Sequence, residues 1–428
     1  MNWQTSIEAI FLISTWIIGH LCLVGAIQDK YKQTSLLAVL LCMVVVYSIK
    51  PATMDFSGYS VYFDTGYWPY ASSYSLGNRG IAETGPYKVE DMHSGDEAGP
   101  PYVTRFPNEP GFTSTMQWFA RVLPRGQFLP RLTAMGREYT SDTLVFVVIS
   151  IGLFSFVTAS WNFLSHQLRS QERKQFFLIS IPIILGSIFF FVGSQNAIRQ
   201  FLTLSLCILA ISYLARARYV FALLFSALAI SMHHWGWAFI VLALMVLLLQ
   251  KVIPVRNTEI SPLSLLRSEW LGLGVGIFLA ITIKVLGDIG FSQFGYATAL
   301  LDWQEEFRIS SGIKVFALLF VLIVSEMIAG TTRVDQVMDI RQLRRIAFFV
   351  IAPLAVLPEI FSRVYLLFFA LETIYIVWAL TRDTIRIRLS GVVVFSVYAV
   401  APNALNVLVG KGGWQEIIWL VKQEVLGV

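Results

Sequence analysis

Residues 142–164 read DTLVFVVISIGLFSFVTASWNFL, an apolar run whose one charged residue, Asp142, stands at its start. At a rise of ~1.5 Å per residue, a helix of this length crosses the ~30 Å hydrocarbon core of a bilayer. Similar blocks recur along the chain. The pattern predicts an all-α polytopic membrane protein, because an outer-membrane barrel would show alternating segments of ~10 residues instead.

The composition agrees with this fold class. The chain has 428 residues, of which 56% are hydrophobic and 14% are charged. Soluble domains carry about 25% charged residues, so a soluble enzyme is excluded. The net charge is +5, and we attribute it to basic cytoplasmic connections rather than to nucleic-acid binding.

The apolar blocks predict about twelve spans in a single integral membrane domain, residues 1–428. The two shortest, 219–232 and 346–357, would be tilted, broken or re-entrant. The first run lacks a basic n-region and an A-x-A site, which predicts a retained helix rather than a cleaved signal. The expected spans are 7–27, 35–49, 142–164, 176–193, 198–215, 219–232, 235–250, 270–286, 314–330, 346–357, 361–381 and 389–407.

The connections alternate strictly between basic and nearly uncharged segments. By the positive-inside rule the basic segments face the cytoplasm. They are 30–32, 169–174, 216–218, 251–267, 333–345 and 382–388.

The cysteines predict neither a disulfide framework nor a zinc site. All three, Cys22, Cys42 and Cys207, lie inside apolar runs, and the chain contains no CxxC and no Cys/His cluster. We therefore expect no metal and no other cofactor.

Residues 51–141 form the one long polar insertion, between the second and third spans, and are predicted to lie outside the cytoplasm as an extracytoplasmic loop or cap. Aromatic rings mixed with carboxylates suit sugars, which stack on rings and hydrogen-bond through hydroxyls. The alternative is a small folded cap whose rings form its own core. The rings are Tyr59, Tyr62, Phe63, Tyr67, Trp68, Tyr70, Tyr74, Tyr87, Tyr102, Phe106, Phe112, Trp118 and Phe119.

Four cations depart from the charge pattern because they fall at the outer ends of spans: Arg199, Arg308, Arg363 and Lys284. An arginine at membrane depth is usually paired or functional, and guanidinium groups bind phosphate oxygens bidentately. Their convergence would suit a pyrophosphate-linked lipid. The alternatives are snorkelling or a salt bridge to one of the acids at 302, 359 and 372.

Two adjacent histidines, His233 and His234, fall at an outer turn, one hairpin after Arg199. Histidine titrates near neutrality and can take a proton from a sugar hydroxyl. The alternative is an interfacial His-Trp cluster. Two acids, Asp55 and Glu109, are further candidates for a base, although Glu109-Pro110-Gly111 also reads as a turn.

Five features in order resemble the EpsG branch of the Wzy-type polysaccharide polymerases. They are Asp55 followed by tyrosines, Glu109-Pro110-Gly111-Phe112, Asn196-x-Ile198-Arg199-Gln200, the turn at His233, and Arg363-x-Tyr365. Family members usually show His-x-Ser/Thr-Ala, whereas here His233 precedes His234-Trp235-Gly236. Either histidine therefore matches the family's position.

The resemblance implies a metal-independent enzyme of the bacterial inner membrane, with its site facing outward, that polymerises exopolysaccharide or O-antigen repeat units linked to undecaprenyl pyrophosphate. His233, His234, Asp55 or Glu109 would activate the acceptor hydroxyl. The implied partners are the bilayer, the lipid-linked glycan, and a chain-length regulator and a flippase of the same pathway. The expected substrate-binding residues are Arg199, Gln200, Asn196, Arg363, Tyr365, Arg308, Lys284 and Tyr59.

Two other classes remain as alternatives. A polysaccharide ligase or a polyprenyl-phosphate-sugar transferase shares much of this chemistry, and the donor distinguishes them. A flippase or transporter for lipid-linked glycans would place charged or broken helices near mid-membrane in paired halves. The sequence shows only Glu372 deep in an expected span and no internal symmetry.

Overall fold

Within the residues that it describes, the computed structural model contains helices and no strands, as the composition predicts. These are residues 32–49, 56–65, 109–129, 140–190 (without 167, 169 and 188), 193–194, 198–252 (without 234), 262–289, 314–325 (without 324) and 340–381, with scattered positions between 11 and 19. The elements are α2 (Lys32–Ile49), α3 (Phe56–Thr65), α6 (Pro110–Val122), α7 (Asp142–Leu164), α8 (Ser170–Gly186), α10 (Ile198–Ala215), α11 (Tyr219–Met232), α12 (Gly236–Val252), α13 (Pro262–Ile289), α16 (Ile340–Ile351), the 3-10 helix η3 (Ala352–Val356) and α17 (Pro358–Thr381).

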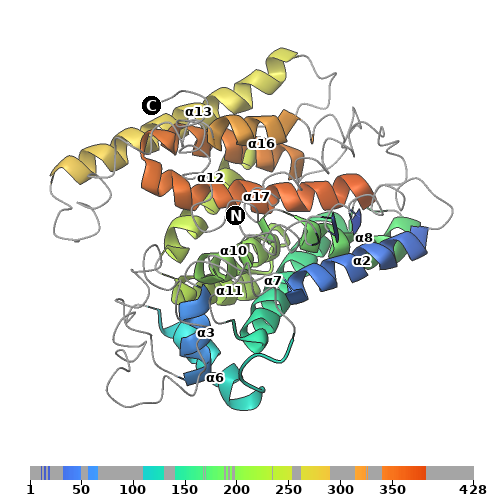
Figure 1. Cartoon of the computed structure of the whole chain (residues 1–428). Helices are drawn as coiled ribbons and strands as arrows, with labels where there is room; N and C mark the ends of the chain where they lie inside the picture. Colours follow the sequence, from blue (N-terminus) through green and yellow to red (C-terminus); the bar gives the residue numbers. More distant parts are fainter. Residues whose placement is uncertain are drawn as a thin grey trace, which may run out of the picture.

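Helix α10 is the centre of the bundle (Figure 1). It packs against α7, α11, α12 and α17, and its residues are buried almost continuously from Ile198 to Ser212. A helix that is apolar on every side is stable only when neighbours cover all of its faces. Its first turn, which carries Arg199, is therefore held in a fixed position relative to four other helices.

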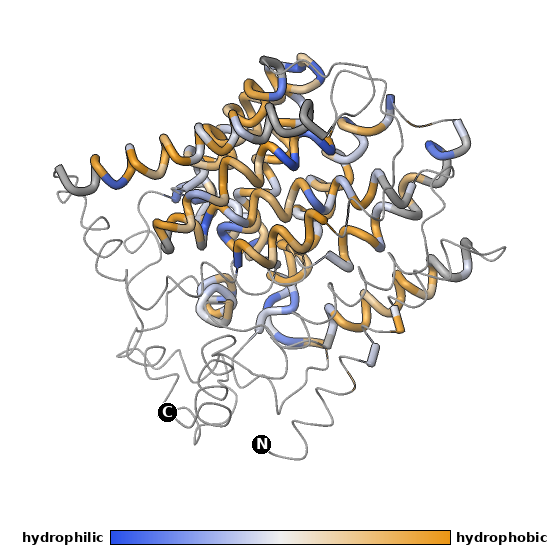
Figure 2. Tube along the Cα trace, turned by 90° about the horizontal axis from the view of Figure 1, so that it is seen from above, coloured by the Kyte–Doolittle hydropathy of each residue, from blue (hydrophilic) through white to orange (hydrophobic). Residues whose placement is uncertain are grey.

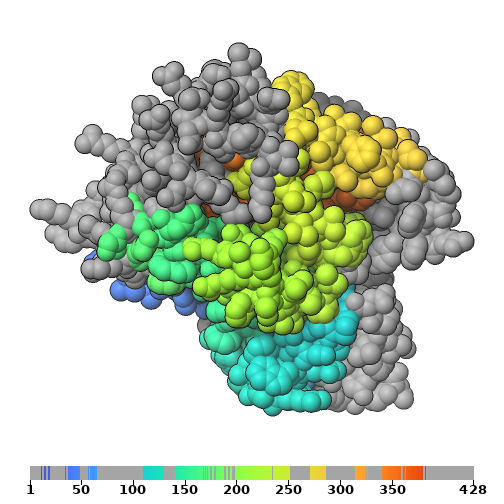
Figure 3. Space-filling model, turned by 180° about the vertical axis from the view of Figure 1, so that it is seen from behind, coloured from blue at the N-terminus to red at the C-terminus, as the bar shows by residue number. Residues whose placement is uncertain are grey.

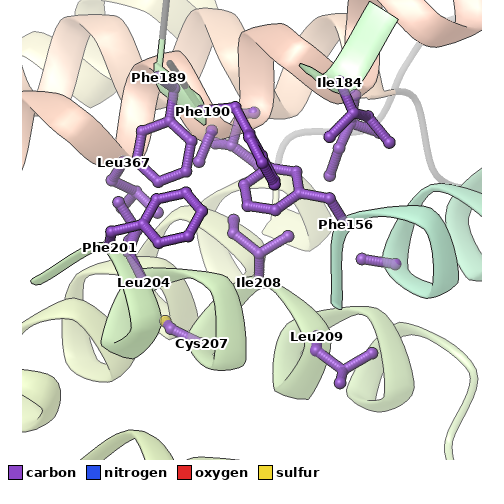
Figure 4. Packing of buried hydrophobic residues seen from close by; sticks show 14 of the residues in the cluster. Phe156, Ile184, Phe189, Phe190, Phe201, Leu204, Cys207, Ile208, Leu209 and Leu367 are labelled. Atoms are coloured by element: carbon purple, nitrogen blue, oxygen red, sulfur yellow. The ribbon is translucent and has the colours of Figure 1, made fainter. Parts of the chain in front are cut away.

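Four phenylalanine rings fill the space where α7, α10 and the segment after α8 meet (Figure 4). The Phe201 ring lies 5.3 Å from Phe189 and 5.0 Å from Phe190, centroid to centroid. The Phe156 ring lies 5.2 Å from Phe189. Tilted and edge-on ring pairs of this kind add about 0.5–1.5 kcal/mol each beyond the area that they bury.

The helices of the second half of the chain form another group, which packs against α10 and α12 (Figure 1). This group consists of α13, α16, η3 and α17. The expected short span 346–357 is in fact divided between α16 and η3, and the change of helix type comes directly before Pro353. Proline lacks an N–H group and clashes with the preceding turn, which explains the break. A new helix, α17, starts at Pro358, because proline is well tolerated in a first turn.

Most residues along the helices of the bundle are apolar (Figure 2). Large side chains on α11 are exposed, among them Val220 at 77% and Leu223 at 71%. Among the described residues, two helices, α7 and α10, are long and apolar enough to cross a membrane. Five shorter apolar helices accompany them: Leu37–Ser48, Tyr219–Met232, Gly236–Gln250, Trp270–Val285 and Lys314–Ile323.

The described part of the predicted insertion, α3 and α6, forms a small unit at one end of α11, where Figure 3 shows the surface of α6 in cyan. Arg125 Nη1 donates to the backbone oxygen of Asp64 at 2.9 Å, and Ser141 Oγ donates to the Asp64 carboxylate at 3.0 Å. Asp142 accepts from the backbone N–H groups of residues 128–129 at 2.6 Å. These bonds fasten the unit to the start of α7.

The rings in this unit are mostly its own core. Tyr59, Tyr62, Phe63 and Phe112 are buried, whereas Trp118 is 58% exposed. For these four rings, the folded-cap alternative describes the observed packing.

The sequence interpretation of Arg344 is wrong. It counts this residue with a basic cytoplasmic connection, but Arg344 lies in α16 and is fully buried. Its Nη1 donates to Glu372 Oε2 at 2.8 Å and also to Ser325. Its guanidinium lies 3.8 Å from the centre of the Tyr375 ring. The isolated acid expected at position 372 is thus neutralised inside the bundle.

Candidate functional site

The carboxylate of Glu109 bridges Arg199 and His233. Its Oε2 accepts from Arg199 Nη1 at 2.6 Å, and its Oε1 lies 2.6 Å from His233 Nδ1. The Glu109 and His233 side chains are 2% and 3% exposed, and that of Arg199 is 16% exposed. Charge-assisted bonds this short in a buried site hold all three groups in one geometry.

The segment around Glu109 explains why its carboxylate can make this bridge. Glu109 is the N-cap residue of α6, but its side chain makes no cap hydrogen bond. Its backbone oxygen accepts from the N–H and the hydroxyl of Thr113, both at 3.2 Å. Pro110 suits the first helical position because no N–H is needed there. The carboxylate is therefore available to reach away from its own helix.

Gly111 allows α6 to approach α11 closely. A Cβ at Gly111 would lie 2.0 Å from Ser231 Oγ and 3.0 Å from the backbone carbon of Ser231. Any side chain at position 111 would therefore push the two helix ends apart. Ser231 lies two residues before His233, so this contact sets the separation between Glu109 and the imidazole.

Two aromatic rings pack next to the Glu109–Arg199 ion pair. The Arg199 guanidinium lies 5.2 Å from the centre of the Tyr59 ring, within range of a cation–π interaction. Tyr59 in turn meets Phe112 edge-on at 5.5 Å. The Glu109-Pro110-Gly111-Phe112 segment thus supplies the acid, the helix start, the close approach and one of the supporting rings.

His233 stands in extended backbone immediately after α11. Its backbone oxygen accepts from Gly236 N at 2.8 Å, which closes the turn into α12. A Cβ at Gly236 would lie 2.5 Å from the backbone oxygen of Ala229. The tight turn therefore has room only for glycine at position 236.

A second polar group links α10 to α17 at the same end of the bundle. Gln200 Nε2 donates to the backbone oxygen of Arg363 at 2.9 Å. Two residues further along α17, Lys314 Nζ lies over the Tyr365 ring, 5.4 Å from its centre. Arg199 and Gln200 are neighbours, so one helix turn connects the two groups.

Sequence reasoning missed Lys314. The signal for it was its position as the first residue of an expected span at the outer side, where Arg199 and Arg363 also fall.

The structure therefore brings together Tyr59, Glu109, Arg199 and His233, with Gln200, Arg363 and Tyr365 beside them. Lys284 is exposed on α13, which packs against α12, α16 and η3. The remaining predicted site residues, Asp55, Asn196, His234 and Arg308, lie outside the described residues.

Glu372, one of the acids expected to pair with an outer arginine, pairs instead with Arg344, and Arg199 bridges to Glu109. Within the described residues, no group of three His, Cys, Asp or Glu side chains is placed to hold a metal ion.

The model of the EpsG family matches residues 137–417, more than half of the chain. The match includes Arg199, Gln200, His233, Arg363 and Tyr365, whereas Glu109 precedes it. No curated protein matches the chain, and no solved structure does. The chain belongs to the EpsG family, and this membership, together with the apolar helices, supports an enzymatic role in polysaccharide polymerisation at a membrane.

Proposed function

We propose that this protein polymerises oligosaccharide repeat units carried on undecaprenyl pyrophosphate, at the outer face of the bacterial inner membrane. The observation that carries the proposal is the bridge from Glu109 to Arg199 and His233. It joins a group able to accept a proton to a cation that suits a pyrophosphate leaving group. Both belong to one rigid cluster next to an apolar bundle.

His233 is the proposed base. Both carboxylate oxygens of Glu109 are engaged, one by a cation and one by the imidazole. The contact with Nδ1 favours the tautomer that carries its proton on Nδ1, so Nε2 becomes the proton-accepting nitrogen. Glu109 then orients the ring and stabilises the imidazolium, as a positioning residue rather than as the base.

The reaction is a glycosyl transfer. A hydroxyl at the non-reducing end of the acceptor attacks the anomeric carbon of the donor glycan, and its proton passes to His233. A new glycosidic bond forms, the bond between that carbon and the phosphate oxygen breaks, and undecaprenyl pyrophosphate leaves with its electron pair. General-base assistance of this kind contributes roughly 10²–10⁴-fold in rate.

The leaving group requires positive charge beyond Arg199, because Glu109 offsets part of that charge. Arg363 and Lys314 are suited to supply it. Arg363 lies in the second turn of α17, and its backbone oxygen accepts a hydrogen bond from Gln200 of α10. Lys314 begins the helix Lys314–Ile323 and lies over the Tyr365 ring of α17. Cations fixed before the reaction stabilise the developing phosphate charge without reorganising.

In the proposed arrangement, about twelve spans form one membrane domain, with residues 51–141 as a cap on the outer side. No metal or other cofactor takes part. The lipid bilayer delivers the substrate, and a flippase and a chain-length regulator of the same pathway act beside the enzyme.

The test replaces Glu109 with Gln and Arg199 with Ala in the native host. Arg218→Ala is the matched control, an exposed arginine at the opposite end of α11 from His233. After membrane expression is confirmed, lipid-linked and surface glycans are compared on gels with a deletion strain. We expect single repeat units without a polymer ladder in both site variants and a normal ladder in the control.

Two other results would replace the proposal. Full-length polymer that accumulates on the lipid carrier would point to a ligase. Glycans that lack one sugar would point to a transferase of single sugars. A normal ladder in both site variants would remove the cluster from any role in polymerisation.

A further inference from the structure

A small pocket lies between α3 and α6, separate from the Glu109 cluster. Its volume is about 150 Å³, of the order of one sugar ring. Its walls are Tyr62, Phe63, Met116, Gln117, Arg121 and Arg125. The polar side chains among them offer hydrogen-bond donors, and none of the described lining residues carries a carboxylate.

Part of the pocket wall is held in place by hydrogen bonds and by burial. Arg125 Nε donates to the backbone oxygen of Ala120 and its Nη1 to that of Asp64, both at 2.9 Å. These bonds fix the guanidinium against the pocket wall. Tyr62 and Phe63 are each 2% exposed, so their positions are set by the core of the cap.

Burial raises the pKa of the Tyr62 phenol, against the opposing effect of the nearby polar groups of Gln117 and Thr113. The phenol therefore keeps its proton at neutral pH and can donate it in a hydrogen bond.

Helix α6 links this pocket to the Glu109 cluster. Glu109 caps the start of α6, and Gln117 and Arg121 lie further along the same helix. The first residue of α6 in the pocket wall is Met116, so at a rise of ~1.5 Å per residue the pocket begins about 10 Å from Glu109. That distance is covered by a short run of linked sugars, whereas it is too long for one sugar to touch both places.

We infer that the pocket holds a sugar unit of the glycan, at a position two or more units away from the bond that is formed. The inference rests on the proposed polymerase function. Donors from Gln117 and the two arginines match sugar hydroxyls, which accept hydrogen bonds from a fixed direction. Binding at two points along one chain raises the affinity of long glycans over short ones, because the second contact is intramolecular.

The test measures binding to the full-length protein in lipid nanodiscs. The probes contain one sugar unit and three linked sugar units, and they are prepared by partial hydrolysis of the host's own polymer. The variant is Gln117→Ala with Arg121→Ala, two exposed side chains. Val122→Ala is the matched control, since Val122 is 57% exposed and adjoins Arg121 without lining the pocket.

In the wild type and the control we expect the three-unit probe to bind about tenfold more tightly than the one-unit probe. In the variant this gain disappears, while affinity for the one-unit probe stays unchanged. In cells the variant makes a shorter polymer but still joins the first two repeat units. A single Arg121→Gln variant provides the same readout if the double variant is poorly expressed.

Equal binding of both probes to the wild type would overturn the inference, and so would an intact gain in the variants. Failure of the proposed function gives a different result, because Glu109→Gln would then leave the polymer ladder unchanged whatever the pocket binds. Loss of the ladder in Glu109→Gln together with an intact length gain in the pocket variants would refute the pocket alone.

Discussion

Glu109 and His233 meet at 2.6 Å across 124 residues of sequence, from the start of one helix and the end of another. The acid lies before the residues that match the EpsG family, and the imidazole lies within them. The contact therefore joins the cap to the bundle. A change in the cap that moves α6 would act directly on the proposed base.

The choice between the two histidines can be tested by substitution. We expect His233→Ala to lower polymerisation by roughly 10²-fold or more, since a general base is lost. His234→Ala is the comparison, and it should retain most activity. The measurement is the rate of polymer formation in membranes supplied with lipid-linked repeat units. An inactive His234→Ala protein beside an active His233→Ala protein would reverse the assignment.

Gly111→Ala should reduce activity because the new methyl group overlaps Ser231. Overpacking of this kind costs about 1–3 kcal/mol, and here the strain falls on the Glu109–His233 distance. Adding Ser231→Gly removes the two nearest atoms, at 2.0 and 2.7 Å, and leaves the backbone contact at 3.0 Å. We therefore expect partial recovery in the double variant. No recovery, measured as polymer yield at equal expression, would show that another contact limits position 111.

Lys314→Gln should weaken substrate binding. A hydrogen bond to a charged group contributes about 1.5–3 kcal/mol, which corresponds to an increase in KM of roughly tenfold or more for the lipid-linked substrate. The control is Lys284→Gln, a lysine exposed on α13. Steady-state kinetics on purified protein distinguish the two. A larger effect at position 284 would return the substrate-binding role to the residue chosen from the sequence.

The buried pair of Arg344 and Glu372 should matter for stability rather than for chemistry. Removing one partner, as in Glu372→Ala, leaves an uncompensated buried charge and should cost about 3–5 kcal/mol in the free energy of unfolding. Replacing both partners by Met and Leu should largely restore stability, because neither charge remains. Thermal unfolding in detergent measures both. A Glu372→Ala protein as stable as the wild type would mean that water reaches the pair.

His166 should make the protein less stable in mild acid. Burial, and then the positive charges of Arg216 and Arg173, lower the pKa of His166. The unfolded chain, with a pKa of about 6.5, then binds the proton more readily than the folded one, so stability is lost as pH falls below that value. His166→Gln should flatten this loss. Unfolding temperatures at neutral and mildly acidic pH provide the comparison, and identical slopes in both proteins would contradict the prediction.

Local sequence was sufficient for three helices, whereas the expected spans 176–193 and 270–286 correspond to α8 (Ser170–Gly186) and α13 (Pro262–Ile289) with other bounds. The bounds expected for 142–164, 198–215 and 219–232 coincide with α7, α10 and α11. Apolar runs define these helices because helical backbone hydrogen bonds join residues only four positions apart in the chain. The break at Pro353 likewise follows from a local property, the missing N–H group.

Sequence also identified most members of the site as separate candidates, including Glu109, Arg199 and His233. What it could not determine was their relationship. It left Glu109 open as a base or a turn residue, sought the partner of Arg199 among other acids, and placed Arg344 in a loop. Partners of a buried charge are chosen by three-dimensional distance, so only the packing of α6 on α11 and of α16 on α17 decided which acid neutralises which arginine.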